Sequence, residues 1–218
     1  MKGSQSGIDR DIIVPTRDVE LPGRLTIPPR AVGLVVFAHG SGSSRFSPRN
    51  RKVASALNKG SLATLLFDLL TSSEERKRDN MFDIELLAAR LGDAATWART
   101  KPEASGLPVG YFGSSTGAAA ALWASTEPDG QVDAVVSRGG RPDLAAPRLP
   151  SVTAPTLLIV GENDDSVIDL NREAQEQLTG TSELTIVPGA GHLFEEPGTL
   201  DLAATLAGDW FVEHFGRA

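Results

Sequence analysis

The sequence predicts an α/β fold with a mostly parallel central sheet of about eight strands and helices on both faces. Short apolar runs alternate along the chain with longer segments of helical periodicity, and strands joined through helices run parallel in one sheet. From residue 33 onward these runs are apolar throughout, as expected for strands that are covered on both faces.

The expected elements alternate regularly. The strand candidates are residues 12–14, 24–27, 33–38, 62–67, 109–112, 134–137, 156–160 and 183–187. The helix candidates are residues 50–58, 83–100, 115–125, 170–178 and 200–215. Asp83 is a suitable N-cap for its helix, in which Ile84, Leu87 and Leu91 share one face.

Two connections shape the expected edges of the fold. The first two strands are separated by Leu21-Pro22-Gly23, a turn sequence that predicts an antiparallel hairpin at the sheet edge. After the strand at 134–137, the chain holds only a short loop and a proline-rich connection. We therefore expect no sizeable lid and a site open to small or exposed substrates. No linker or repeat interrupts residues 1–218, which we expect to form a single domain.

Composition excludes several classes of protein. The 218 residues carry a net charge of −7, which argues against a nucleic-acid partner or an anionic membrane surface. The absence of cysteine excludes disulfides and thiolate chemistry and fits a reducing compartment. Residues 1–7 lack the apolar core of a signal peptide, and no apolar run is long enough to span a bilayer. We expect a cytoplasmic protein.

The motif Gly113-Ser114-Ser115-Thr116-Gly117 lies between a predicted strand and an alanine-rich helix. In a G-x-S-x-G elbow the serine lies on a tight strand-to-helix turn, and the glycines leave room for that turn. Serine is also a common helix N-cap. The glycines on both sides centre the motif on Ser115 and predict a nucleophile there.

A serine hydroxyl needs a base that removes its proton during attack. Of the three histidines, His192 lies on a loop directly after the last predicted strand. His39 comes too early in the chain order to be the base, and His214 is expected at the surface or in packing of the final helix. The sequence therefore predicts His192 as the base.

The acid that orients the imidazolium is expected after the strand at 156–160. Asp164 is the first choice and Asp165 the alternative, because spacing does not separate adjacent carboxylates. The three residues then follow one another along the chain as nucleophile, acid and base, which is the order found in enzymes with a G-x-S-x-G elbow.

Two backbone N–H groups are predicted to hold a developing oxyanion. One is that of Thr116, and the other is that of Ser41 in the loop His39-Gly40-Ser41-Gly42. A phosphate-binding loop is the rival interpretation, but the Gly-Lys-Ser/Thr ending is missing. No metal-ligand spacing occurs, and we expect neither metal nor cofactor.

Arginines follow two strands at the predicted catalytic edge, Arg45, Arg49 and Arg51 after one and Arg138 and Arg141 after another. Ligands bind beyond the carboxyl ends of parallel strands, so Arg45 and Arg138 are candidates for holding a substrate carboxylate or phosphate. The alternative is that these charges pair with nearby acids.

At these residues the chain resembles the α/β-hydrolase superfamily, and within it the dienelactone-hydrolase-like branch. The resemblance covers nearly the whole length and rests on residues 38–42, 113–119, 161–167 and 191–192. It implies a Ser115-His192-Asp164 triad and hydrolysis of esters or lactones without a cofactor. Dienelactone hydrolase itself has a cysteine where this chain has Ser115, which moves the expectation toward a carboxylesterase.

The expected function is therefore hydrolysis of small carboxylic esters or lactones through an acyl-enzyme on Ser115. Two alternatives stay open. The same triad could pass the acyl group to another acceptor or act on thioesters, or the fold could serve as a binding module with little turnover. The partner in each case is a small molecule.

Overall fold

The computed structural model describes residues 7–216, so all but Gly7 of the N-terminal stretch discussed above lies outside it. The strands are β1 (Ile8–Pro15), β2 (Glu20–Ile27), β3 (Gly33–Ala38), β4 (Leu62–Phe67), β5 (Val109–Ser114), β6 (Ala134–Arg138), β7 (Thr156–Gly161) and β8 (Ser182–Val187). The α-helices are α1 (Pro48–Lys59), α2 (Ile84–Arg99), α3 (Thr116–Ala124), α4 (Asp165–Gln175) and α5 (Thr199–Phe215). Short 3-10 helices are η1 (Arg78–Phe82), η2 (Pro128–Gly130) and η3 (Pro142–Ser151).

All eight strands join one sheet in the order β1-β2-β4-β3-β5-β6-β7-β8. From β4 to β8 neighbouring strands are parallel, and only β1 and β2 are antiparallel to their neighbours. The chain passes from β3 outward to β4 and then returns across β3 to β5. Such a reversal opens a crevice at the carboxyl ends of the strands. The predicted fold class is confirmed.

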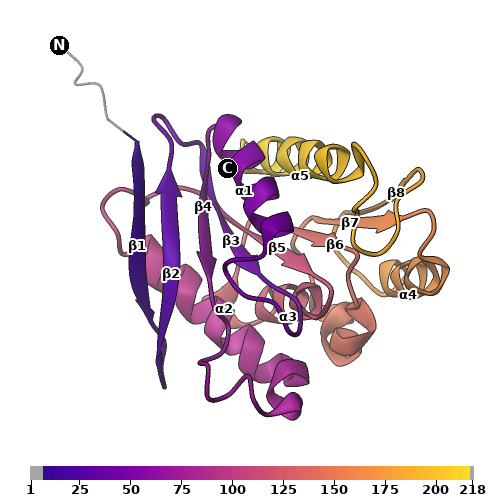
Figure 1. Cartoon of the computed structure of the whole chain (residues 1–218), viewed down its shortest axis with the longest axis horizontal. Coiled ribbons are helices and arrows are strands. Elements are labelled where there is room, and N and C mark those ends of the chain that lie inside the picture. The colour runs from indigo at the N-terminus through magenta and orange to yellow at the C-terminus, as the bar shows by residue number, and fades with distance from the viewer. Residues whose placement is uncertain (1–6, 217–218) are drawn as a thin grey trace.

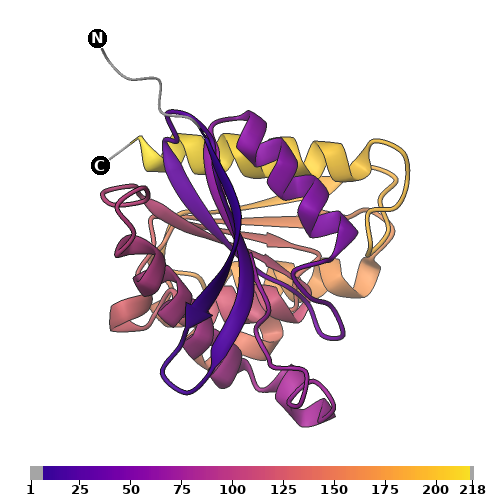
Figure 2. The ribbon, with the colours of Figure 1, turned by 60° about the vertical axis from the view of Figure 1, so that its left-hand side comes forward.

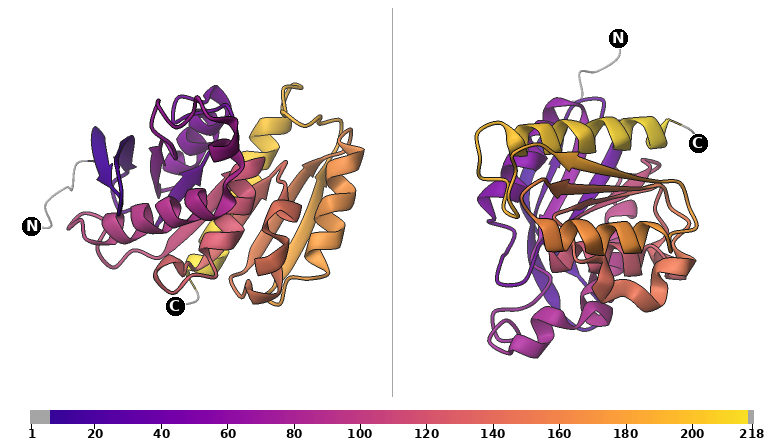
Figure 3. Two further views of the ribbon diagram at one scale, coloured as in Figure 1. Left: turned by 90° about the horizontal axis from the view of Figure 1, so that it is seen from below. Right: turned by 90° about the vertical axis from the view of Figure 1, so that its right-hand side faces the viewer.

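Helices cover both faces of this sheet (Figures 1 and 3). Helices α1 and α5 lie on one face, and α2, α3 and α4 lie on the other. Alternate residues of a strand therefore enter different cores: Val35 and Phe37 pack with α1 and α5, whereas Leu34 and Val36 pack with α2 and α3. This two-sided burial explains why the parallel strands are apolar at every position.

The first hairpin forms at the predicted edge but turns at a different place. Figure 2 shows β1 and β2 in front of the rest of the sheet, crossing the strands behind them because the sheet is twisted. The turn occupies residues 16–19, where the Thr16 N–H donates to the Val19 carbonyl oxygen at 2.9 Å, so the predicted turn at 21–23 is wrong. Pro22 lies within β2, one residue outside its pairing with β4, where the missing N–H breaks no bond of that ladder.

No lid covers the carboxyl ends of the strands from the connection between β6 and β7. That connection contains η3, which packs against α3 and α4. Helix α4 begins at Asp165, five residues before the predicted start at 170. Among residues 7–216, no helix is long and apolar enough to cross a membrane.

Candidate active site

Ser115 lies on the tight turn between β5 and α3. Its backbone has φ 52° and ψ −123°, a conformation that L residues rarely adopt and that is found mostly at functional sites. The flanking glycines make this turn possible. A Cβ at Gly113 would lie 2.4 Å from the Ala118 Cα, and one at Gly117 would lie 2.2 Å from the Ala38 carbonyl oxygen. The predicted elbow geometry is confirmed.

His192 lies on the loop between β8 and α5, and its ring contacts Asp164. The His192 Nδ1 atom is 2.6 Å from Asp164 Oδ2. Because an ionised carboxylate only accepts hydrogen bonds, Nδ1 carries the proton in this contact and Nε2 is left for the pocket. Asp165, the alternative acid, is exposed in the first turn of α4.

One small cavity contains Ser115 and His192 together. It has a volume of about 190 Å³ and is lined also by Ser41, Arg49 and Arg138. The Ser115 hydroxyl has no hydrogen-bond partner within residues 7–216, so the structure does not join it to His192 by a hydrogen bond. The predicted nucleophile and base thus share a cavity, with the hydroxyl free.

The two residues predicted to supply the oxyanion donors are joined by a hydrogen bond between backbone and side chain. The Ser41 N–H donates to the Thr116 Oγ1 atom at 2.7 Å, so this N–H is engaged by a protein oxygen. The Thr116 N–H, at the start of α3, has no acceptor in the described part of the chain. Of the two donors, Thr116 is therefore the one that is available, and the role of Ser41 stays a prediction.

The neighbouring His39 has a structural role. Its Nδ1 lies 3.0 Å from the Gly40 carbonyl oxygen, and its Nε2 accepts the Leu69 N–H at 3.0 Å. Burial lowers the pKa of His39, because the charged imidazolium loses hydration there. A neutral His39 therefore fastens the loop after β3 to the segment after β4. His214 is also buried, and it packs against Trp210.

The arginines divide into paired and unpaired groups. Arg45 forms an ion pair with Asp68 and lines neither cavity at the site, so its substrate contact stays a prediction. Arg141 pairs with Asp143 at 2.7 Å.

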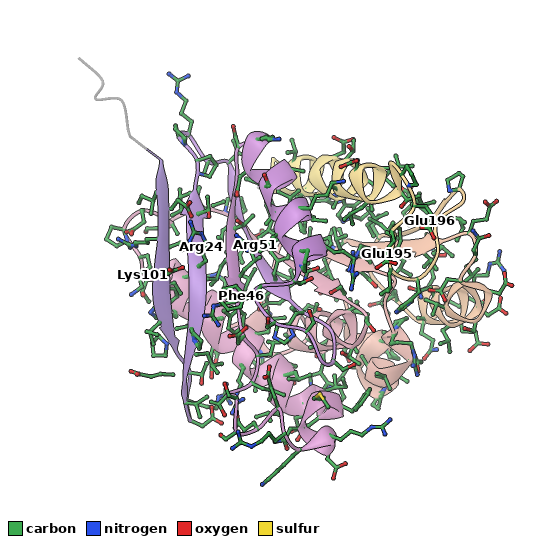
Figure 4. All side chains as sticks on the ribbon, in the orientation of Figure 1. Arg24, Phe46, Arg51, Lys101, Glu195 and Glu196 are labelled. Atoms are coloured by element: carbon green, nitrogen blue, oxygen red, sulfur yellow. The ribbon has the colours of Figure 1, made fainter. Side chains whose placement is uncertain are left out.

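The remaining arginines differ in burial. Arg51 is exposed on α1. Arg49 of α1 pairs with Glu195 at 3.0 Å. Figure 4 shows Glu195 on the loop that precedes α5. Arg138 is only 6% exposed and pairs with no acid among the described residues.

A larger cavity adjoins the first. It has a volume of about 660 Å³ and shares Gly40, Ser41 and Arg49 with the smaller one. Its apolar lining comprises Phe46, Pro48, Leu69, Leu70, Met81 and Leu87. Sequence analysis missed this wall, half of which comes from the connection between β4 and α2. The length of that connection was the available signal, because long connections in compact domains are often functional.

The chain is similar to one protein family and to several solved structures. The model of the dienelactone hydrolase family matches residues 62–213. The crystal structure of a dienelactone hydrolase from Anabaena variabilis is 53% identical, superposes with a TM-score of 0.92, and covers 96% of this chain and 99% of that chain. The structure of Est1E from Butyrivibrio proteoclasticus shares the fold, with a TM-score of 0.80. It is 14% identical in sequence, and the match covers 95% of this chain and 99% of that chain.

A curated relative is longer than this chain. A Mycobacterium tuberculosis protein named "Putative phosphoribosyl transferase" is 59% identical over 206 residues, which are 94% of this chain and 46% of that protein. The chain thus spans about half the length of the curated relative that it matches, and the relative's name describes that longer protein.

Proposed function

Because this chain belongs to the dienelactone hydrolase family, we propose that it is a serine hydrolase that cleaves carboxylic esters or lactones through an acyl-enzyme on Ser115. The observation that carries the proposal is the strained elbow at Ser115, which opens into the same cavity as His192. His192 is in turn held by Asp164 at 2.6 Å. A nucleophile, a base and an orienting acid are the parts that acyl transfer needs.

In the proposed mechanism, the Ser115 oxygen attacks the substrate carbonyl carbon while the His192 Nε2 atom takes the hydroxyl proton. The Asp164 carboxylate stabilises the imidazolium that forms. The Thr116 N–H donates to the carbonyl oxygen as it becomes negative. His192 then returns the proton to the leaving alkoxide, and water attacks the acyl-enzyme by the same steps in reverse.

The two cavities support a substrate with an apolar portion. The smaller one surrounds the reacting atoms, and the larger one presents apolar side chains from the segment after β4. Since the cavities share Gly40, Ser41 and Arg49, one ester can occupy both, with the carbonyl at Ser115. We propose no cofactor for this reaction and a small molecule as the partner.

The test is hydrolysis of para-nitrophenyl acetate and butyrate by the wild type and by Ser115→Ala. We expect kcat to fall by at least about 10⁴-fold, as when the nucleophile of a triad is removed. Ser125→Ala is the matched control, because Ser125 lies at the other end of α3 with its hydroxyl on the Leu122 carbonyl oxygen. Equal rates for wild type and Ser115→Ala would contradict the proposal.

Two further measurements separate the alternatives. Stoichiometric labelling by a fluorophosphonate, lost in Ser115→Ala, would establish an activated serine. Product analysis with added alcohols, amines and thioesters would tell whether water is the acyl acceptor. Labelling without turnover of any ester, lactone or thioester would favour the binding module.

A further inference from the structure

The side-chain hydroxyl of Thr116 joins the elbow to the loop after β3. Its Oγ1 atom accepts the Ser41 N–H at 2.7 Å, and Thr116 is the first residue of α3, directly after Ser115. The loop and the elbow are closely packed here, because a Cβ at Gly40 would lie 3.1 Å from the Ser115 Cβ and 3.8 Å from its Oγ. Ser41 and Ser115, the neighbours of Thr116 through hydrogen bond and chain, both line the small cavity.

The hydrogen of this hydroxyl has no protein acceptor. A threonine hydroxyl can accept and donate at the same time. Since Oγ1 accepts from Ser41, its own hydrogen is directed elsewhere, and it meets no acceptor among residues 7–216. Thr116 is only 2% exposed, so bulk water is largely excluded from it. Buried hydroxyl groups are normally fully hydrogen-bonded, and the fold leaves this donor free next to the proposed nucleophile.

The backbone N–H of Thr116 is a second free donor on the same residue. It has no acceptor in the described part of the chain. Only Cα and Cβ separate it from the hydroxyl, so a single oxygen atom can accept both. The Ser41 N–H is already used by Oγ1. A hydrogen bond that a hydroxyl accepts polarises it and strengthens the one that it donates.

From this arrangement we propose that the Thr116 hydroxyl is a catalytic oxyanion donor, which acts with the Thr116 N–H on the carbonyl oxygen of the substrate. Ser41 is then a positioning residue, whose N–H orients and polarises the hydroxyl. The proposal rests on the proposed hydrolase function, to which it adds a catalytic group. The carbonyl oxygen becomes fully negative only in the tetrahedral intermediate, so the hydroxyl stabilises the transition state more than the bound ester.

The kinetic test replaces the hydroxyl by a methyl group of similar size in Thr116→Val. With para-nitrophenyl butyrate, kcat should fall by about 10²- to 10³-fold, the usual effect of losing one oxyanion donor, and KM should change little. Thr116→Ser keeps the hydroxyl and should keep most of the activity. Thr156→Val is the matched control, because Thr156 is fully buried at the start of β7 with its hydroxyl on the Ala154 carbonyl oxygen at 2.9 Å.

A different role of the same hydroxyl predicts the opposite result. If Oγ1 merely occupied the Ser41 N–H, its removal would free that N–H for the substrate, and kcat of Thr116→Val would stay the same or rise. Such a result would overturn the inference. So would a Thr116→Ser variant as impaired as Thr116→Val, because the lost methyl group and its packing would then explain the effect.

A trifluoromethyl ketone provides a readout that needs no turnover. With 1,1,1-trifluoroheptan-2-one, the Ser115 oxygen bonds to the carbonyl carbon, the hydroxyl proton passes to His192, and the carbonyl oxygen becomes an anion. Fluorine NMR against pH measures the pKa of this hemiketal. Thr116→Val should raise that pKa by about 2, the equivalent of 100-fold weaker stabilisation of the anion. Thr116→Ser should leave it nearly unchanged, and a merely structural hydroxyl would leave it unchanged in both variants.

The outcomes separate this inference from the proposed function. If the hemiketal pKa responds as expected but no ester, lactone or thioester is hydrolysed, the hydrolase function fails and the donor role stands. If esters are hydrolysed and Thr116→Val keeps the kcat of the wild type, the reverse holds. If Thr116→Val does not fold, Thr116→Ala undergoes the same measurements. A wild-type hemiketal whose pKa is no lower than that of the ketone hydrate in water, or no hemiketal at all, overturns the donor role without any variant.

Discussion

Replacing Ser115 by glycine should abolish ester hydrolysis and still give a more stable protein than replacing it by alanine. Ser115 has φ 52° and ψ −123°, and holding a residue other than glycine in such a conformation costs about 1–3 kcal/mol. Glycine adopts positive φ without this steric penalty. Both variants lack the hydroxyl, so their difference isolates the backbone strain.

The expected magnitude follows from two opposing effects. Glycine gives the unfolded chain more freedom, which lowers stability by about 0.4–1 kcal/mol. Loss of the half-buried Cβ removes at most about 0.8 kcal/mol of apolar burial. When each of these three free energies is taken near the middle of its range, the relief of strain exceeds the two losses. Ser115→Gly is then more stable than Ser115→Ala by about 1 kcal/mol. For a chain of this length that raises Tm by about 2–4 °C.

Calorimetry and urea denaturation of the two variants measure this difference. Ser125 provides a matched comparison, because it has φ −64° and ψ −14° at the end of α3, where alanine is not strained. There, Ser125→Gly should be the less stable member of its pair. If Ser115→Gly were as stable as Ser115→Ala or less, while the Ser125 pair behaved normally, the elbow would store no strain and the reasoning would be refuted.

The remaining predictions concern two carboxylates. Asp164→Asn should lower kcat for ester hydrolysis by about 10²- to 10⁴-fold, because the amide no longer holds His192 with its Nδ1 proton; the matched variant Asp165→Asn should retain most activity, and the reverse outcome would reassign the acid. Arg90 pairs with Glu74 at 2.7 Å, and this guanidinium together with hydrogen bonds from Thr71 lowers the pKa of Glu74 from 4.5 to about 2. The resulting stability is present above pH 4.5 and lost as pH falls toward 2. Glu74→Gln should therefore flatten the decline of Tm in this range, and identical acid profiles for wild type and variant would contradict that assignment.

The parallel part of the fold was predictable because its burial pattern is simple. Strands such as β3 and β5 are buried at every residue, so their apolar runs stand out against amphipathic helices. The first hairpin was harder, because β1 is mostly exposed and shows little apolar patterning. Pro22 and Gly23 there suggested a turn, and only the pairing partners reveal that proline is tolerated at that position in β2.

The site was predictable to the extent that backbone geometry dictates residue type. The elbow glycines exist because side chains there would overlap the chain, and this requirement is visible in the sequence. Which arginine meets an acid is different, because it depends on segments distant along the chain. Arg45 is neutralised by Asp68, which follows β4, whereas Arg138 finds no acid among the described residues. Spacing in the sequence carries no information about such pairs.

The backbone, rather than side-chain contacts, determines how far Arg138 lies from Ser115. The Ser115 N–H donates to the Arg138 carbonyl oxygen at 3.4 Å, and the Arg141 N–H donates to the Ser115 carbonyl oxygen at 3.1 Å. The loop after β6 is thus fastened to the elbow on both sides of the nucleophile. The backbone on both sides of the proposed nucleophile is therefore held in place when substrate enters, as a pre-organised site requires.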